Sequence, residues 1–225
     1  MIMPTYPSQP PINPKIEALT SFWSPAGVYQ VTPNLWSAVG FGPANIMMIK
    51  GTDGLIIIDT GIGYGQGKEV MQEFRTLDPD LPVKAIIYTH GHVDHVQGAG
   101  AFAEQGKNVI VYAHDSTLAF YVDENALLGP IQSLRAAYAA GALLPKEGPD
   151  RQFMGILPTS PDRGSISFVP PTKTFSDQMD IDISDVKLKL IHVQGETTDH
   201  INIWYPEEKV LFIGDNAYGI VPNIL

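Results

Sequence analysis

Short hydrophobic runs, each bounded by Pro, Gly or Asn, dominate the first third of the sequence. Runs of this length between turn residues are typical of strands joined by tight turns. Gly51 to Gly54 is a hairpin-type turn between two of them. The strands expected here cover residues 28–31, 35–39, 45–50 and 55–59. They predict an antiparallel meander that contributes to one sheet.

Helical spacing of apolar residues appears further along the chain. Val70, Met71 and Phe74 predict an amphipathic helix over 65–77, and a helix could start within 97–103. Residues 119–144 are rich in Ala and Leu and predict a largely helical segment that is interrupted at Gly129 and Pro130. More strands are expected at 83–88, 108–113, 186–193, 200–205 and 210–213. This mixture of strands and helices predicts an α/β fold.

The composition fits one large domain. The 225 residues are 44% hydrophobic, and we expect residues 26–225 to form that domain, with the proline-rich, polar residues 1–25 as an extended arm. The net charge of −10 gives no basic surface, which argues against nucleic-acid and anionic-membrane partners. No apolar stretch is long enough to be a transmembrane segment, and the first fifteen residues lack a signal-peptide pattern. The absence of cysteine excludes disulfides and thiolate metal ligands.

Candidate chemistry is concentrated between Thr89 and His95, where His90, His92, Asp94 and His95 follow the expected strand 83–88. Side chains at the carboxyl end of a strand are where α/β folds place their ligand sites. Imidazole suits zinc or iron, and residues two apart on a turn can face one ion while an Asp-His pair faces a second. A polar surface loop with scattered histidines explains this spacing less well, because the motif has its strand context.

The His-x-His-x-Asp-His pattern resembles the signature of the metallo-β-lactamase superfamily. Residues 54–61 are similar to the strand and Asp-Thr-Gly turn of that family, 195–200 to its third ligand loop, and 213–216 to its bridging-carboxylate element. The resemblance implies an αββα sandwich whose last elements would lie beyond the C-terminus of this sequence. It also implies that Asp59 supports the ligand loop from behind; capping of the glycine-rich turn is its other possible role.

A narrower resemblance links residues 123–145 and 169–172 to the alkylsulfatase branch of the family. These segments contain its Glu-Asn, Arg-Ala-x-Tyr, Gly-x-x-Leu-Pro and Pro-Pro-Thr elements. Asn125, Arg135 and Tyr138 could donate hydrogen bonds to an anionic sulfate ester, with Arg best suited to bidentate contact. The alternative, that Arg135 and Tyr138 only pack and pair along the helix, stays open.

The resemblance also implies a ligand set for two metals. The first would be held by His90, His92, Glu196 and a bridging Asp215, and the second by Asp94, His95 and the same Asp215. Glu196 matches the branch, whereas Asp215 is shorter than its usual glutamate, and His200, expected behind the ligands, stands where the branch tends to have a carboxylate. The family completes its second metal with a later histidine, and no histidine follows His200 here. We therefore expect a fragment of a longer protein, in which a homodimer is possible; a divergent minimal protein is the alternative.

The implied function is hydrolysis of an alkyl sulfate ester, a small anionic molecule with an apolar tail, by a metal-bound hydroxide at two Zn²⁺ ions. Asp94 would accept a proton from the attacking water. His92 favours zinc, because di-iron relatives have glutamate at that position. Two other hypotheses stay open. Asp215 and His200 favour another binuclear zinc hydrolase acting on thioesters, lactones or β-lactams, and the missing ligand favours an inactive fragment or a binding domain.

Overall fold

Two β-sheets and a layer of helices make up the part of the chain that the structure describes, residues 26–139 and 165–218. The structure is a computed structural model. The larger sheet has seven strands in sequence order, of which the first four are antiparallel and β4 to β7 are parallel. Its strands are β1 (Gly27–Thr32), β2 (Leu35–Val39), β3 (Ile46–Lys50), β4 (Leu55–Ile58), β5 (Val83–Ile87), β6 (Ile110–His114) and β7 (Lys173–Phe175).

The smaller sheet is antiparallel, with the order β11-β10-β9-β8. It consists of β8 (Gln178–Ile183), β9 (Val186–His192), β10 (Ile201–Tyr205) and β11 (Val210–Phe212). Burial alternates along β9 and β10, as expected for strands with one face on the core and one toward solvent. In contrast, all four residues of β4 are buried, because both faces of the central strands are covered.

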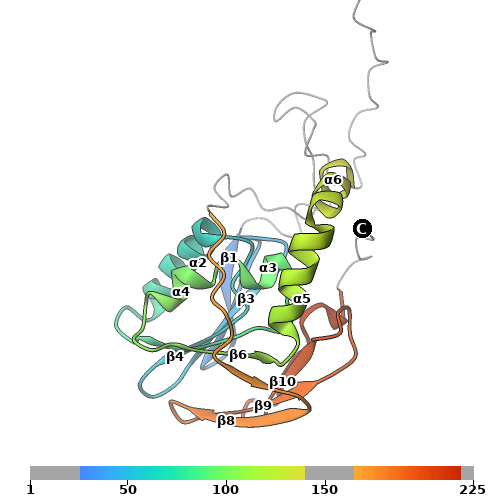
Figure 1. Cartoon of the computed structure of the whole chain (residues 1–225). Coiled ribbons are helices and arrows are strands. Elements are labelled where there is room, and N and C mark those ends of the chain that lie inside the picture. The colour runs from blue at the N-terminus through green and yellow to red at the C-terminus, as the bar shows by residue number, and fades with distance from the viewer. Residues whose placement is uncertain (1–25, 140–164, 219–225) are drawn as a thin grey trace, which may run out of the picture.

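Helices line one face of the larger sheet and one of its edges (Figure 1). α2 and α4 pack together, and the chain between β6 and β7 continues as a long helix that includes a π-helical segment, η1. The helical elements are α2 (Tyr64–Leu77), α3 (Val93–Val96), α4 (Ala99–Ala103), α5 (Thr117–Asp123), η1 (Glu124–Leu128), α6 (Gly129–Ala139) and the 3₁₀ turn η2 (Gly214–Asn216).

Two hydrophobic clusters define the layers. In the first, Val70, Met71 and Phe74 of α2 pack with Phe102 of α4 on one face of the larger sheet. In the second, the other face of that sheet packs against the smaller sheet, for example Ile58 in the same cluster as Leu190 and Ile203. The order of layers is helices, sheet, sheet. No helix within residues 26–139 and 165–218 covers the outer face of the smaller sheet (Figure 1).

Most of the predicted elements are confirmed, including the helix over 65–77 and the strands around the histidine motif. β7 and β8 were not predicted, because β7 has only three residues and the segment before it showed little periodicity. The helix after β6 is not broken at Gly129 and Pro130, which begin α6. Pro130 cannot donate a hydrogen bond to the preceding turn, and the π-helical segment lies directly before it. The expected arm, 1–25, and the helical residues 140–144 lie outside the described residues.

A membrane-spanning helix would have to be long and apolar, and none of the helices in the described ranges meets that requirement.

Candidate metal centre

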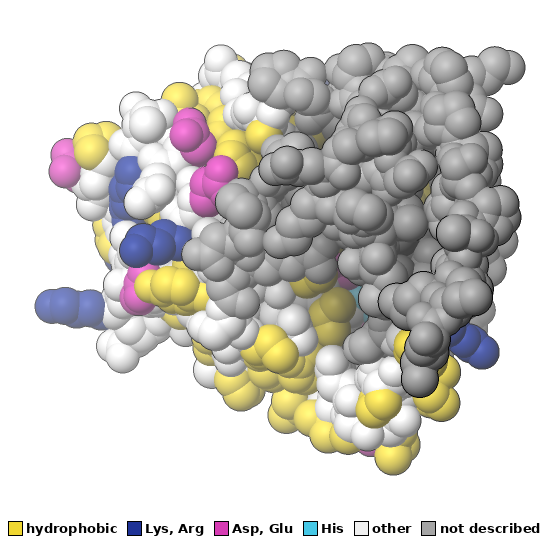
Figure 2. Space-filling view, turned by 90° about the horizontal axis from the view of Figure 1, so that it is seen from above, with side chains coloured by type: hydrophobic (Ala, Val, Ile, Leu, Met, Phe, Trp, Pro, Cys, Tyr) yellow, Lys and Arg dark blue, Asp and Glu magenta, His cyan; other side chains and the backbone are white. Residues whose placement is uncertain are grey.

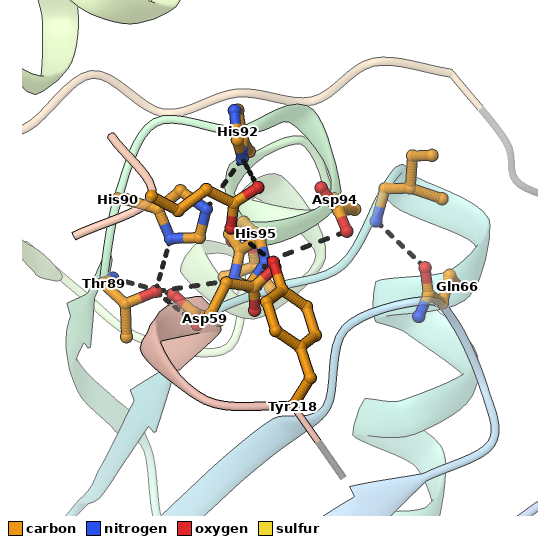
Figure 3. A network of polar contacts seen from close by, with 12 residues as sticks. Asp59, Gln66, Thr89, His90, His92, Asp94, His95 and Tyr218 are labelled. Carbon is orange, nitrogen blue, oxygen red and sulfur yellow. Dashed lines mark hydrogen bonds and ion pairs between the residues drawn. The ribbon is translucent and has the colours of Figure 1, made fainter. Parts of the chain in front are cut away.

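The candidate site lies where the two sheets meet. Asp59 follows β4 and the motif from Thr89 to His95 follows β5, so both come from carboxyl ends of adjacent parallel strands. Glu196 lies in the loop between β9 and β10, and Asp215 lies in η2 after β11. One sheet therefore supplies the histidines His90, His92 and His95, which Figure 3 shows together, and the other supplies two carboxylates.

Backbone contacts fix the two loops of the larger sheet together. The amide and the hydroxyl of Thr60 both donate to the carbonyl oxygen of His95, at 2.7 and 2.9 Å. Gly98 lies so close to this turn that a Cβ there would be 2.0 Å from the Thr60 carbonyl oxygen. Only glycine fits that approach, so the residue directly before α4 has to be glycine.

Asp59 is buried beneath the histidines and accepts three hydrogen bonds. Its Oδ1 accepts from the Thr89 amide at 2.8 Å, and its Oδ2 accepts from the Thr89 hydroxyl and from His95 Nδ1, each at 2.8 Å (Figure 3). Its backbone is left-handed, with φ of 57°. Asp and Asn adopt that conformation more readily than most residues. This carboxylate orients both the loop backbone and a histidine ring, which is how the outer partner of a metal ligand acts.

The hydrogen-bond network assigns the tautomers of two histidines. His95 Nδ1 donates to Asp59, so its Nε2 carries no hydrogen in the neutral ring. The Thr89 hydroxyl hydrogen goes to Asp59, so His90 Nδ1, 3.1 Å from Thr89 Oγ1, is the donor in that contact. His90 Nε2 is then also without a hydrogen and lies 3.0 Å from His92 Nδ1, which would donate to it unless a cation lies between the two nitrogens. Acceptor nitrogens thus converge on one space.

His95 Nε2 is buried with no hydrogen-bond partner in the described parts of the chain. A buried nitrogen without a partner is costly, and a cation is one way to satisfy it. Asp215 Oδ1 lies 3.4 Å from this nitrogen and Asp94 Oδ2 lies 3.8 Å from it, which are ion-pair distances. The donor set of imidazoles and carboxylates fits a divalent transition metal.

Among the residues that the structure describes, two groups of side chains could each hold a metal ion, and within each group the ligand atoms lie within 4.8 Å of one another. One group is His90, His92 and Glu196, and the other is His90, His95 and Asp215. Glu196 Oε1 is 3.5 Å from His92 Nδ1. Tyr218 connects the groups, because its hydroxyl donates to Glu196 Oε2 at 2.7 Å and lies 3.2 Å from Asp215 Oδ2.

The charges of the site shift several pKa values. Burial lowers the pKa of His90, and the neighbouring histidines lower it further. Burial also opposes the charged form of His95, but Asp59 and Asp94 outweigh it and raise the pKa of His95 well above its ordinary value. Burial raises the pKa of Glu196. Burial would also raise the pKa of Asp215, but the hydrogen bond and the charge of His95 outweigh burial and lower this pKa to about 2. The carboxylates around His95 thus favour a positive charge at this place.

The six predicted ligands are brought together, and the residue expected behind them, His200, lies beside them. The His200 ring stacks on His90, with ring centroids 4.8 Å apart, and its Nδ1 is 3.1 Å from the side-chain nitrogen Nδ2 of Asn216. The three predicted substrate residues do not point into this cluster. Asn125 donates to the Tyr121 carbonyl oxygen at 2.7 Å, whereas Arg135 and Tyr138 are exposed on α6.

Sequence reasoning missed Thr89, Tyr218 and Glu124. Thr89 precedes the motif. Only the structure shows that its hydroxyl donates to Asp59 and accepts from His90, so that it links the two side chains. Tyr218 carries no recognisable spacing signal. Glu124 was visible as part of the Glu-Asn pair, but the polar role was assigned to Asn125. In the structure Glu124 Oε2 lies 3.7 Å from His92 Nε2.

A groove of about 460 Å³ adjoins the cluster. Phe120, Leu127 and Leu128 line it together with Asp123, Glu124 and Thr198. The Phe120 ring is 5.6 Å from the His92 ring, so the groove begins beside the candidate ligand His92. Seen from above, hydrophobic side chains gather next to the point where a histidine reaches the surface (Figure 2).

Comparison with known proteins agrees with this geometry. The family model of the metallo-beta-lactamase superfamily matches residues 39–222, and the chain therefore belongs to that superfamily. Within it, the chain is 37% identical over 182 residues to the linear primary-alkylsulfatase of Pseudomonas sp. (strain ATCC 19151), an alignment that covers 79% of this chain and 34% of that protein. It is 26% identical over 221 residues to the (R)-specific secondary-alkylsulfatase of Pseudomonas sp, an alignment that covers 95% of this chain and 33% of that protein.

Solved structures give the same result. The stereoselective inverting sec-alkylsulfatase Pisa1 from Pseudomonas sp. superimposes with a TM-score of 0.78 at 27% identity, covering 89% of this chain and 32% of that one. A metallo-beta-lactamase from Pontibacter korlensis, at 20% identity and a TM-score of 0.52, shares the fold. The predicted fold class and family are confirmed. The chain spans about a third of the length of the alkylsulfatases it matches.

Proposed function

We propose that this chain is the catalytic domain of a metal-dependent hydrolase that cleaves alkyl sulfate esters at two zinc ions. The observation that carries the proposal is the convergence of bare imidazole nitrogens and carboxylates on one space, ending in a buried His95 Nε2 without a partner. The alkylsulfatase relatives at 26 to 37% identity support the substrate class.

His90, His92 and Glu196 would hold one cation, and Asp94, His95 and Asp215 the other, with Asp215 also facing the first. Bound there, the cations would activate water as a nucleophile and neutralise the charge of the sulfate group. The protein's own contribution is to hold the ligand rings in the right tautomer through Asp59 and Thr89. Asp94, whose side chain is about a quarter exposed, would accept a proton from the attacking water.

The groove beside His92 would bind the apolar tail. Phe120, Leu127 and Leu128 present hydrocarbon surface along the helix after β6, and removing an alkyl chain from water is favourable by about 0.8 kcal/mol for each buried CH₂ group. A straight-chain sulfate ester would then have its charged head at the histidines and its tail along this wall.

The first test measures the metal content of the purified 225-residue chain together with sulfate release from dodecyl sulfate. Close to two zinc ions per chain with turnover is the expected result. His90→Asn should lose metal and activity together, whereas His114→Asn should keep both, because His114 bonds to Ser116 and Ser176 outside the cluster. A chain that binds no zinc, or binds zinc without releasing sulfate, contradicts the proposal.

A second candidate function is hydrolysis of another ester type, such as a thioester. The chain is 24% identical over 189 residues to the human acyl-coenzyme A thioesterase MBLAC2, covering 78% of this chain and 58% of that protein. A panel of alkyl sulfates, acyl thioesters and lactones separates the two candidates. Turnover of a thioester without sulfate release would favour the second.

A further inference from the structure

His92 is oriented differently from the other two histidines of the cluster. Its Nδ1 faces His90 Nε2 at 3.0 Å and Glu196 Oε1 at 3.5 Å, so the metal position lies on the Nδ1 side. Its Nε2 therefore points outward, toward Glu124 Oε2 at 3.7 Å. The ring stands between the candidate metal position and this carboxylate.

Asp59 and Thr89, which orient the other two histidines, make no hydrogen bond with His92 among the contacts described above. His95 donates to Asp59 and His90 donates to Thr89, so each of these rings has a hydrogen-bond partner that fixes its orientation. Metal-ligating histidines almost always donate their second ring N–H to such a partner. For His92, Glu124 is the group in the described residues that occupies the matching place.

Glu124 is itself held in place. Its Oε1 accepts a hydrogen bond of 2.6 Å from Gln132 Nε2, and its side chain is only 16% exposed. It is the first residue of the π-helical segment η1, and such segments occur frequently at functional sites because they reposition side chains within a helix. The contact between Gln132 and Glu124 spans this segment, so one carboxylate oxygen stays free to face His92.

We infer that Glu124 is a positioning residue for His92: it accepts the Nε2 hydrogen and so keeps the Nδ1 lone pair directed at the metal. The 3.7 Å separation is longer than a hydrogen bond, and the contact is expected to tighten when Nδ1 binds a cation. Gln132 orients Glu124 in turn. This inference rests on the proposed metal centre and extends its ligand support to the helix that lines the groove.

The test measures the affinity of the full chain for Co²⁺ and Zn²⁺ by competition with a chromophoric chelator, and records the visible spectrum of the Co²⁺ form. Glu124→Ala should weaken metal binding by about 10-fold to 100-fold and change the Co²⁺ spectrum. Glu124→Gln keeps a neutral acceptor and should fall in between. Gln132→Ala should cause a smaller loss, of about 2-fold to 5-fold, because it acts only through Glu124.

Asp123→Asn is the matched control. It removes the adjacent carboxylate, which lines the same groove but is exposed, and should leave affinity within about twofold of the wild type. The thermal unfolding of each metal-free variant separates a folding defect from a loss of positioning. If Glu124→Ala lowers the unfolding temperature but binds metal as tightly as Asp123→Asn, Glu124 is only structural and the inference is wrong. If the wild-type chain itself binds no metal, the proposed function fails first and the inference fails with it.

Discussion

Replacing Asp59 by Asn tests the tautomer argument directly. The substitution keeps the size of the side chain and the left-handed backbone, so the loop should retain its path. The amide oxygen can still accept from the Thr89 N–H. The amide NH₂ group, however, then faces Thr89 Oγ1 and His95 Nδ1, both of which donate to Asp59 in the wild type.

The expected magnitude follows from these contacts. Two buried hydrogen bonds to a charged acceptor, worth about 1.5 to 3 kcal/mol each, are lost or reversed. The Thr89 hydroxyl can rotate to accept from the amide and recover part of this, so we expect the unfolding free energy to fall by about 2 to 4 kcal/mol. His95 escapes the clash by moving its hydrogen to Nε2, where it blocks the metal position. Zinc affinity should fall by at least about 100-fold.

Urea unfolding gives the stability change, and chelator competition gives the zinc affinity. Asp53→Asn is the control, because Asp53 is an exposed carboxylate whose contacts are a surface ion pair of 3.1 Å with Lys84 and a hydrogen bond with Ser184. It should leave both the unfolding free energy and the zinc affinity close to the wild-type values. An Asp59→Asn chain that binds zinc as tightly as the Asp53→Asn control would refute the reasoning.

Three further predictions concern other parts of the structure. Burial raises the pKa of Asp78, but its contacts with Lys50 and two backbone amides outweigh this and lower it, so Asp78 stabilises the fold above its unfolded pKa. Asp78→Asn should cost about 1 kcal/mol near neutral pH, and the difference should shrink as pH falls toward the lowered folded pKa in melts from pH 7 to 3. Gly98→Ala should destabilise by about 3 kcal/mol or more in urea, since its Cβ would overlap the Thr60 carbonyl oxygen. Tyr218→Phe removes a donor to two site carboxylates and should weaken metal binding by up to about 10-fold in the same competition assay.

Each of these has an outcome that contradicts it. A stability difference for Asp78→Asn that stays constant down to pH 3 would mean that its charge is not involved. A Gly98→Ala chain as stable as the wild type would show that the turn and the helix can separate at little cost. Unchanged metal affinity in Tyr218→Phe would assign the phenol to packing alone.

The histidine loop could be predicted from the sequence, because the spacing of its residues and its position after an apolar strand are both patterns within a short stretch of the chain. The pairing of Glu196 and Asp215 with these histidines came from family resemblance, since no local pattern brings residues of a second sheet to that place. The contact between Glu124 and His92 could not be predicted at all. It joins two residues that lie on separate elements about thirty positions apart, and neither hydrophobic periodicity nor helix propensity encodes such a contact.

The interface between the two sheets, which we call the seam, determines which part of the molecule should unfold locally first. The sheets are joined by apolar packing and by a few hydrogen bonds, such as that from the Ile201 amide to the Thr89 carbonyl oxygen at 2.8 Å. Cations bound by His90 and His95 on one side and by Glu196 and Asp215 on the other would be crosslinks across that seam. Metal removal should then lower the local stability of one sheet more than that of the other. Amide hydrogen exchange should accelerate in β9 to β11 well before it does in β4 and β5, so that the smaller sheet becomes the part that a protease reaches first.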